Sequence, residues 1–293
     1  MTRGRDWFLG LLLVAACGVF VFFLASLFFG FSNDEFDLHT GARVGVVEVE
    51  GVILDSKKAV EQIERYENDA SIPAVVLRID SPGGGVAASQ EIYEAAKRLR
   101  GKGKVVIASM GSTAASGGYY VACAADKIVA NPGTTTGSIG VIMEMLNATE
   151  LMSKIGVRFD IIKSGKFKDS GSPFRQMAEE ERQYFQKYVD DAYEQFVGVV
   201  GSARGMEKSE VLQYADGRVF TGQQAQEIGL VDTLGTYQDA LAIAAEMSGI
   251  EGRPRVVSPK KRKVTIWDLL FGDLEQHLIR LQTLPVLRYQ WVM

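Results

Sequence analysis

Apolar runs alternate with helix-compatible runs over residues 43–130, and this alternation sets narrow limits on the fold. Several of the apolar runs end in glycine or other small residues, and runs with apolar residues at helical spacing lie between them. Short links between such elements predict parallel strand pairing, with the helices outside the sheet. The expected fold class is therefore α/β with a mainly parallel sheet and flanking helices.

The pattern extends beyond this region to about residue 252. We expect strands over residues 44–53, 74–79, 105–109, 126–130 and 157–163. We expect helices over residues 56–69, 86–100, 119–125, 178–204, 221–229 and 237–247. Residues 80–85 and 131–140 are expected to be loops because they are rich in glycine, proline and small polar residues. An apolar stripe along residues 178–204 indicates either core packing or a subunit contact.

An uncharged segment, residues 7–31, precedes this domain. It is long enough to cross a hydrocarbon core of about 30 Å as a helix. Arg3 and Arg5 lie before it and acidic residues follow it, which predicts an N-terminus in the cytosol and the domain outside. The alternative is a cleaved signal peptide, but its apolar core would be shorter and would end at a small-residue site. We therefore expect an uncleaved single-pass anchor.

Composition excludes several function classes. The net charge of −4 argues against a nucleic-acid partner. Cys17 and Cys123 lie in different settings, which suggests neither a disulfide framework nor a metal cluster. Residues 83–85 lack the lysine and the glycine spacing of nucleotide-binding loops, so no cofactor is expected. The only two histidines, His39 and His277, lie near the chain ends, so histidine is not the expected base for nucleophilic chemistry.

Ser116 lies where an apolar strand and a run of small residues lead into a helix. A helix start offers free backbone N–H groups and partial positive charge, which would stabilise an oxyanion beside this hydroxyl. Gly83 could supply a second N–H group opposite Gly117, because loops after parallel strands gather at one edge of a sheet. The alternative is that Ser116 only caps the helix.

A serine nucleophile needs a base, and without histidine a desolvated lysine is the remaining choice. Lys163, Lys166 and Lys168 lie together after an expected strand, beside glycine and small polar residues. Their spacing does not choose among them. The alternative is that all three are solvated surface lysines.

Four motifs occur in order: DSPGGG at residues 80–85, MGSTAASGGYY at 110–120, TGSIGV at 136–141 and KSGKFKD at 163–169. Together they resemble the signal peptide peptidase A family of membrane-anchored serine peptidases, over about residues 43–250. The resemblance implies a fold like that of the Clp protease and crotonase superfamily. It also implies catalysis by a Ser–Lys dyad.

The resemblance assigns a role to each matching residue. Ser116 corresponds to the nucleophile and Lys168 to the general base. Ser138 corresponds to the serine that orients this lysine, and Gly83 and Gly117 to the backbone donors of the oxyanion hole.

The resemblance also implies a substrate, an assembly and a location. We expect an endopeptidase that cleaves released signal peptides and similar apolar, extended peptides. A single copy of the domain suggests a short form that assembles into a homo-oligomeric ring. The expected location is the bacterial cytoplasmic membrane, with the catalytic domain on the outer, periplasmic or extracellular, side.

Five segments organise the chain in this interpretation. The expected segments are a cytosolic N-terminus 1–6, an anchor 7–31, a linker 32–42, a peptidase domain 43–252 and a tail of unknown role 253–293. Two other functions stay open. One is a related peptidase that cuts a single membrane partner, such as a stomatin-like protein. The other is a crotonase-like acyl-CoA binder or a non-catalytic membrane scaffold.

Overall fold

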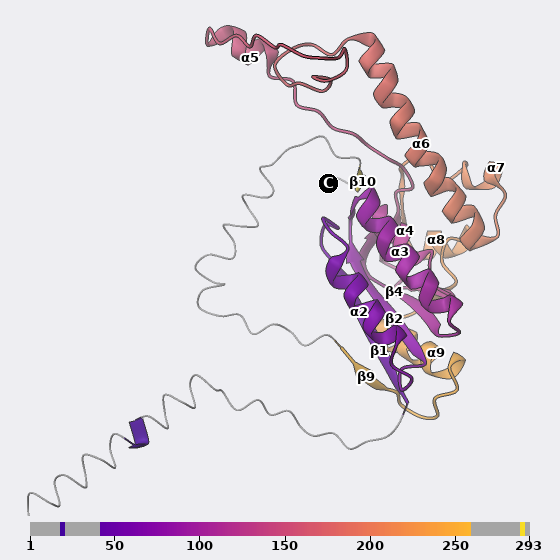
Figure 1. Ribbon diagram of the computed structural model, residues 1–293. Helices are drawn as coiled ribbons and strands as arrows, with labels where there is room; N and C mark the ends of the chain where they lie inside the picture. The colour runs from indigo at the N-terminus through magenta and orange to yellow at the C-terminus, as the bar shows by residue number, and fades with distance from the viewer. Residues whose placement is uncertain (1–17, 21–41, 259–287, 291–293) are drawn as a thin grey trace, which may run out of the picture. The chain divides into compact units, whose positions relative to one another are not determined.

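The computed structural model describes residues 18–20, 42–258 and 288–290 (Figure 1). Residues 18–20 are helical and belong to a separate unit, residues 1–40. The remainder of the expected anchor and both histidines lie outside the described residues. Among the residues that are described, no helix is both long and apolar enough to cross a membrane.

A mostly parallel sheet forms the centre of the domain, as the sequence predicts. Its strand order is β7-β6-β4-β2-β1-β9, and β5 pairs with β4 and with β8. All neighbours pair in parallel except β6 and β7. The strands are β1 Arg43–Glu50, β2 Ala74–Ser81, β4 Val105–Ala115, β5 Lys127–Ala130, β6 Thr135–Gly137, β7 Val219–Thr221, β8 Thr233–Leu234 and β9 Arg255–Val257.

Helices cover both faces of this sheet (Figure 1). α2 Lys57–Glu67, α3 Val86–Gly101 and α4 Gly117–Ala122 pack on one face, where they share a core with apolar residues of β1, β2 and β4. α9 Tyr237–Met247 packs on the other face, against the opposite set of strand side chains. Strands buried on both sides need apolar residues at nearly every position, which explains their continuous hydrophobic runs.

Two expected loops contain strands instead. β4 continues through residues 110–115, and its second half pairs with β6 inside the expected loop 131–140. Residues 83–85 form β3 Gly83–Gly85, which is bridged to Ile53 and paired with β10 Arg288–Gln290. The prediction of loops was wrong here because small side chains, although poor strand formers, let neighbouring backbones approach closely enough to pair.

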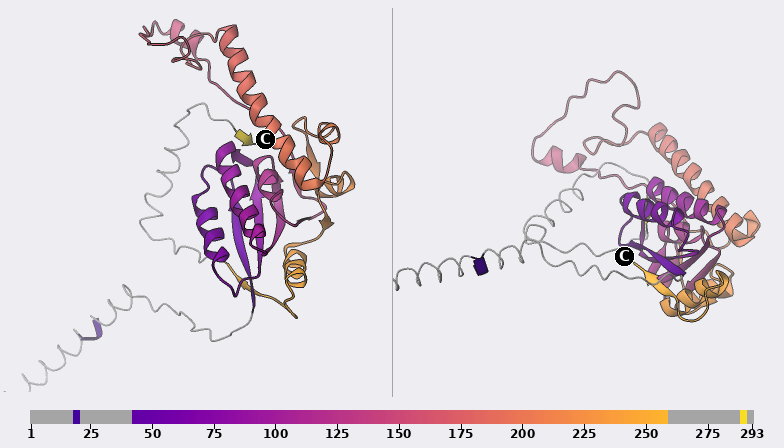
Figure 2. Two further views of the ribbon diagram at one scale, coloured as in Figure 1. Left: turned by 45° about the vertical axis from the view of Figure 1, so that its right-hand side comes forward. Right: turned by 60° about the horizontal axis from the view of Figure 1, so that its bottom comes forward.

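A projecting arm, residues 142–189, stands out from the sheet domain (Figure 2). It contains α5 Thr149–Lys154 and the first part of α6 Glu179–Arg204. Farther along α6, Ala192, Phe196 and Val200 are buried in the domain. The apolar stripe of this helix is therefore core only in its second half.

The expected strand over residues 157–163 is wrong: this segment of the arm has no regular secondary structure. Its apolar side chains are exposed, and Ile162 is fully so. The segment alternates apolar and polar residues as a strand does. A strand, however, needs a neighbouring strand for its hydrogen bonds, and the described part of this chain offers none there.

Of the remaining helices, α8 Gly222–Glu227 was expected from the sequence, whereas the short helices α5 and α7 Lys208–Val211 were not. α7 follows α6, and α8 begins after Thr221. A capping box begins α8: the Thr221 hydroxyl accepts from the Gln224 backbone, and the Gln224 side chain accepts from the Thr221 backbone.

Candidate active site

The structure brings Ser116 and Ser138 together at one edge of the sheet. They directly follow Ala115 and Gly137, which are paired residues at the ends of the parallel strands β4 and β6. The Ser116 backbone N–H donates to the Gly137 carbonyl at 2.8 Å. Both serines are nearly buried, with 1% and 6% of their surface exposed. Two nearly buried serines are thus placed side by side at this edge.

Both serines also have a strained backbone. Ser116 has φ 53° and Ser138 has φ 50°, and no other non-glycine residue in the described part of the chain has a positive φ. Such conformations cost of order 1–3 kcal/mol each and tend to occur at functional sites. Ser116 occupies the N-cap position of α4, but its side chain makes no capping hydrogen bond. Capping therefore does not account for this serine.

The strain predicts that Ser116→Gly stabilises the fold relative to Ser116→Ala. Glycine has no Cβ and so avoids the conformational strain, which costs roughly 1–3 kcal/mol of folding free energy. It also has a more flexible unfolded chain, which lowers stability by roughly 0.5–1 kcal/mol. A net gain of about 1 kcal/mol should raise the melting temperature by roughly 2–4 °C for a domain of this size. The control pair, Ser112→Gly and Ser112→Ala at an exposed position of β4, should show the opposite order. Equal melting temperatures for the two Ser116 variants would contradict the strain.

Gly83 and Gly117 reach the same edge of the sheet. A Cβ atom on Gly118 would lie 2.9 Å from the Ser81 carbonyl oxygen, so α4 begins tightly against the end of β2. Gly117 is the first residue of α4, and Gly83 begins β3 just after β2. In this structure the Gly83 N–H group donates to the Ser81 hydroxyl at 3.1 Å, and that hydroxyl donates to the Gly51 carbonyl at 2.6 Å. The Gly83 amide is therefore already satisfied.

β3 has two edges with different partners. Toward Ile53, the Gly83 carbonyl accepts a hydrogen bond at 2.9 Å and the Gly85 N–H donates one at 2.8 Å. A Cβ atom on Gly84 would lie 2.2 Å from the Ile53 carbonyl oxygen, so this contact requires glycine. The other edge pairs antiparallel with β10, with Gln290 opposite Gly83. A segment of the C-terminal tail thus lies in strand geometry beside the predicted oxyanion donor.

The three candidate lysines differ in their partners. Lys163 Nζ donates to Asp169 Oδ1 at 2.5 Å and to the Lys166 carbonyl at 3.0 Å. Lys166 forms an ion pair with Glu180. These ion pairs occupy two of the three amines, whereas a general base must be free to reach the hydroxyl from which it takes a proton. Lys168 forms no ion pair with any residue that the structure describes, so it is the best suited of the three to act as a base.

Among the described residues of one chain, Lys168 forms no hydrogen bond with Ser116 or Ser138. Lys168 is exposed on the projecting arm, whereas Ser116 lies in the sheet domain (Figure 1). The predicted contact between the two therefore stays a prediction.

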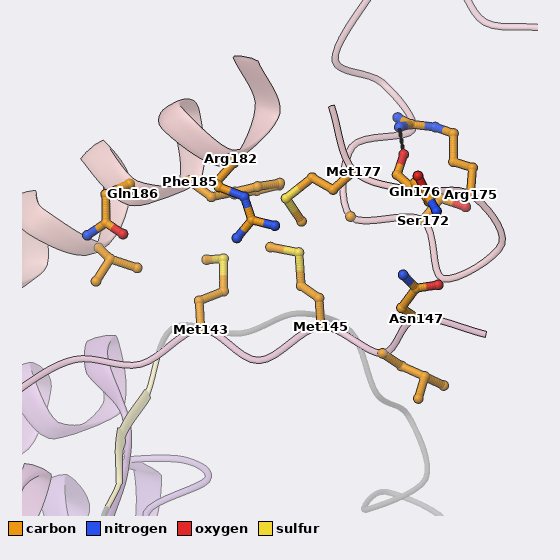
Figure 3. Close-up of a pocket in the computed structure, with 13 residues that line it drawn as sticks. Met143, Met145, Asn147, Ser172, Arg175, Gln176, Met177, Arg182, Phe185 and Gln186 are labelled. Atoms are coloured by element: carbon orange, nitrogen blue, oxygen red, sulfur yellow. Dashed lines mark hydrogen bonds between the residues drawn. The ribbon is translucent and has the colours of Figure 1, made fainter. Parts of the chain in front are cut away.

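Two cavities lie along α6. One, of about 460 Å³, is lined by Ser138, Val141 and Tyr193 among others, so it opens beside the second site serine. The other, of about 490 Å³, lies within the arm. Figure 3 shows Met143 and Met145 pointing from the extended segment toward Phe185 on α6. The first cavity offers space next to Ser138 for an apolar or lysine side chain.

Several polar residues around the site were not predicted. Asp80 Oδ1 accepts from the Thr113 backbone at 3.0 Å and thereby holds β4 where its register with β2 shifts. Ser81 holds the Gly83 turn, as described above. Asp80 and Ser81 are the first two residues of the DSPGGG motif, and this position is the sequence feature that could have identified them. Cys123 is not a rival nucleophile, because burial raises the pKa of its thiol to about 12.

Two family profiles match the chain. That of peptidase family S49 matches residues 98–251, and that of Clp protease matches residues 48–136. The protein slr0021 of Synechocystis sp. is 46% identical over 217 residues, which cover 74% of this chain and 78% of that protein. "Protease 4" of Salmonella typhi is 35% identical over 72% of this chain and 36% of its own length. "Serine protease SPPA, chloroplastic" of Arabidopsis thaliana is 36% identical over 77% of this chain and 32% of its own.

The fold is the α/β fold of Clp proteases, with a mostly parallel sheet. The chain belongs to peptidase family S49, and it is a serine endopeptidase. The family expected from the four sequence motifs is thereby confirmed.

Proposed function

We propose that this protein is a membrane-anchored peptidase that cleaves released signal peptides and similar apolar, extended peptides with a Ser116–Lys168 dyad. The observation that carries the proposal is the pair of strained serines at adjacent strand ends. Ser116 is the nucleophile, and Ser138 is placed to orient a lysine that enters beside it. The matching motifs of the family support the same roles.

The proposed reaction has two steps. In the first, the neutral Lys168 amine takes the proton of the Ser116 hydroxyl, and the oxygen attacks the peptide carbonyl carbon. The lysine then gives this proton to the leaving amine, so that the C–N bond breaks and an acyl-enzyme remains. In the second, Lys168 takes a proton from water as the water oxygen attacks the ester carbon. The lysine then gives this proton to the Ser116 oxygen as the ester C–O bond breaks and the carboxylic acid product leaves. Lys168 must be desolvated in this step, because an amine in water is charged near neutral pH.

The developing oxyanion is assigned to the N–H groups of Gly117 and Gly83. Gly117 begins α4 directly after the nucleophile. The Gly83 N–H group donates to the Ser81 hydroxyl in this structure. It can contribute only if it donates to the hydroxyl and the oxyanion at once, or if the oxyanion replaces the hydroxyl as its acceptor. Backbone donors suit a peptidase with varied substrates, because they bind the peptide carbonyl oxygen whatever side chains flank the bond that is cleaved.

The pairing of β10 with β3 supports strand-like substrate binding. An antiparallel segment lies beside Gly83, Gly84 and Gly85, where backbone hydrogen bonds, not side-chain pockets, hold it. A substrate strand would use the same edge and bring its carbonyl to Ser116. Apolar, extended peptides such as released signal peptides fit such a site.

Deleting residues 288–293 should therefore lower the KM for peptide substrates. A tethered segment competes with the substrate at an effective concentration in the millimolar range. If this concentration is about ten times the dissociation constant of the segment, its removal should lower KM roughly tenfold. The measurement is steady-state hydrolysis of an unfolded apolar peptide by the full-length and shortened chains. An unchanged KM, or a lower kcat with an unchanged KM, would show that β10 does not occupy the substrate edge.

We propose that a second copy of the chain supplies Lys168 to each Ser116, within a ring. The arm that bears this lysine exposes a large set of apolar side chains, as expected for a surface that is covered on assembly. They include Leu146, Leu151, Ile155, Phe159, Ile161, Ile162, Phe167, Tyr184 and Tyr188. A ring of such contacts would bring each arm over a neighbouring sheet edge and desolvate the amine.

A peptidase that cuts one membrane partner remains the second candidate for the substrate. Incubating the full chain, in membrane vesicles, with several released signal peptides of unrelated sequence distinguishes the two. Cleavage of most of them at several bonds supports the proposal. Resistance of all of them, together with a single cut in one membrane protein, would overturn it.

A further inference from the structure

We infer that Arg175 is a positioning residue that fixes the loop carrying Lys168, through a cluster with Asp169 and Glu181. The inference rests on the proposed role of Lys168 as base. We call these three residues the arm clamp. None of them belongs to the dyad or to the oxyanion donors.

The arm clamp is built around one guanidinium group. Arg175 Nε donates to Asp169 Oδ2 at 2.7 Å. Its two terminal nitrogens donate to the two carboxylate oxygens of Glu181, at 2.8 and 2.5 Å. One of them also donates to the Asp169 carbonyl at 3.1 Å. A planar fork with five donors can hold two carboxylates and a backbone oxygen at once, whereas a lysine ammonium cannot match this geometry.

The two carboxylates are well shielded from solvent. The Glu181 side chain is 5% exposed and that of Asp169 is 11% exposed. Glu181 also accepts from the Ser170 hydroxyl at 2.8 Å and from the Ala178 backbone at 2.9 Å. Two shielded carboxylates would repel each other without the arginine between them. The cluster therefore depends on Arg175 more than on any other member.

The arm clamp ties the lysine loop to the start of α6. Asp169 directly follows Lys168, and both its side chain and its carbonyl oxygen are held by Arg175. Glu181 lies in the first turn of α6, so the far side of the clamp is a rigid helix. Two other ion pairs hold this loop, Lys163 with Asp169 and Lys166 with Glu180. Arg175 differs from these lysines because it holds both the side chain and the backbone of Asp169 and joins them to Glu181. Figure 3 shows Arg175 on this loop, bonded to the Gln176 carbonyl.

The charges of the arm clamp persist at the pH of any plausible assay. The Arg175 guanidinium lowers the pKa of the Glu181 carboxyl to about 2 and lowers the pKa of Asp169 as well. Groups with a lowered pKa stabilise the fold above their unfolded values and lose that effect only as the pH falls toward about 2. The clamp is a constant support for the lysine at neutral pH.

Arg175→Ala should lower kcat by about 100-fold and leave KM within about twofold. A base displaced by about 1 Å costs this much, while the peptide-binding edge at β3 is untouched. Amide hydrogen exchange of residues 165–172 should become faster, with the sheet domain unchanged. Guanidinium ion at millimolar concentration should restore part of kcat by filling the vacated position. Arg175→Lys should remain impaired, and Arg182→Ala, an exposed arginine on the same arm, should behave like wild type.

Two results would overturn the inference. One is a wild-type kcat in both Arg175 variants. The other is a loss of kcat with unchanged exchange in residues 165–172 and no rescue by guanidinium. Hydrogen exchange is independent of activity, so it tests the clamp even if Arg175→Ala is inactive for another reason. Full activity of Lys168→Ala would instead show that the proposed dyad, and not the clamp, is wrong.

Discussion

Ser116→Ala is expected to reduce peptide hydrolysis on the order of 10⁴-fold or more while leaving the fold intact. The hydroxyl is the atom that would become acylated, and no neighbouring group replaces it. Cys123 is buried with a raised thiol pKa, and Ser138, which lies beside Ser116, has the proposed role of orienting the lysine and would not attack the peptide. The substitution changes little else, because the Ser116 side chain makes no capping hydrogen bond that would be lost. The measurement is single-turnover and steady-state cleavage of an unfolded peptide.

Ser112→Ala is the matched control, because Ser112 is an exposed serine on the same strand, β4. It should retain wild-type turnover. A serine-directed phosphonate should label the wild type and Ser112→Ala, but not Ser116→Ala. Turnover by Ser116→Ala near the wild-type rate, or labelling at any other serine, would refute the assignment of the nucleophile.

The position of Ser116 followed from the alternation of strands and helices. Apolar runs that end in small residues before a helix predict a strand–turn–helix junction, and parallel pairing predicts that such junctions meet at one edge. Both expectations hold for β4 with α4. They do not extend to β6, which lies in an expected loop and is not followed directly by a helix. The strain at Ser116 and Ser138 could not be predicted, because backbone dihedral angles at a junction depend on the register of the neighbouring strand.

Tertiary contacts reversed two local expectations. Gly83–Gly85 is a poor strand sequence on its own, yet Ile53 and β10 supply hydrogen bonds from both sides. Residues 157–163 are a good strand sequence, but no described segment lies beside them to pair with. Strand formation depends on partners that are distant in sequence or that belong to another molecule, so composition and periodicity alone give both errors.

The structure adds a physical argument to the prediction that Lys168, of the three lysines, is the base. Their spacing allowed any of them, and the resemblance alone favoured Lys168. The ion pairs of Lys163 with Asp169 and of Lys166 with Glu180 give that choice a physical reason. The sequence does not show which carboxylate pairs with which lysine, because several acidic residues lie near these lysines and in the first turn of α6.

Lys168→Ala is expected to lower kcat about 10³-fold or more, because the Ser116 hydroxyl then has no base. Lys168→Arg should be equally inactive, since a guanidinium group does not release its proton in proteins. Lys166→Ala is the matched control: it removes an exposed lysine two residues away, whose partner Glu180 is also exposed, and should keep wild-type turnover. Activity in Lys168→Ala, or inactivity in Lys166→Ala alone, would remove Lys168 from the mechanism.

A mixture of two inactive variants tests whether the lysine comes from a neighbouring copy. When Ser116→Ala and Lys168→Ala are co-expressed in equal amounts, a site built from two copies has an intact serine and an intact lysine in about a quarter of cases. The mixture should therefore recover about a quarter of wild-type turnover. A dyad within one chain would recover none, because each chain lacks one of its two groups. The exposed position of Lys168 on the projecting arm favours the first result.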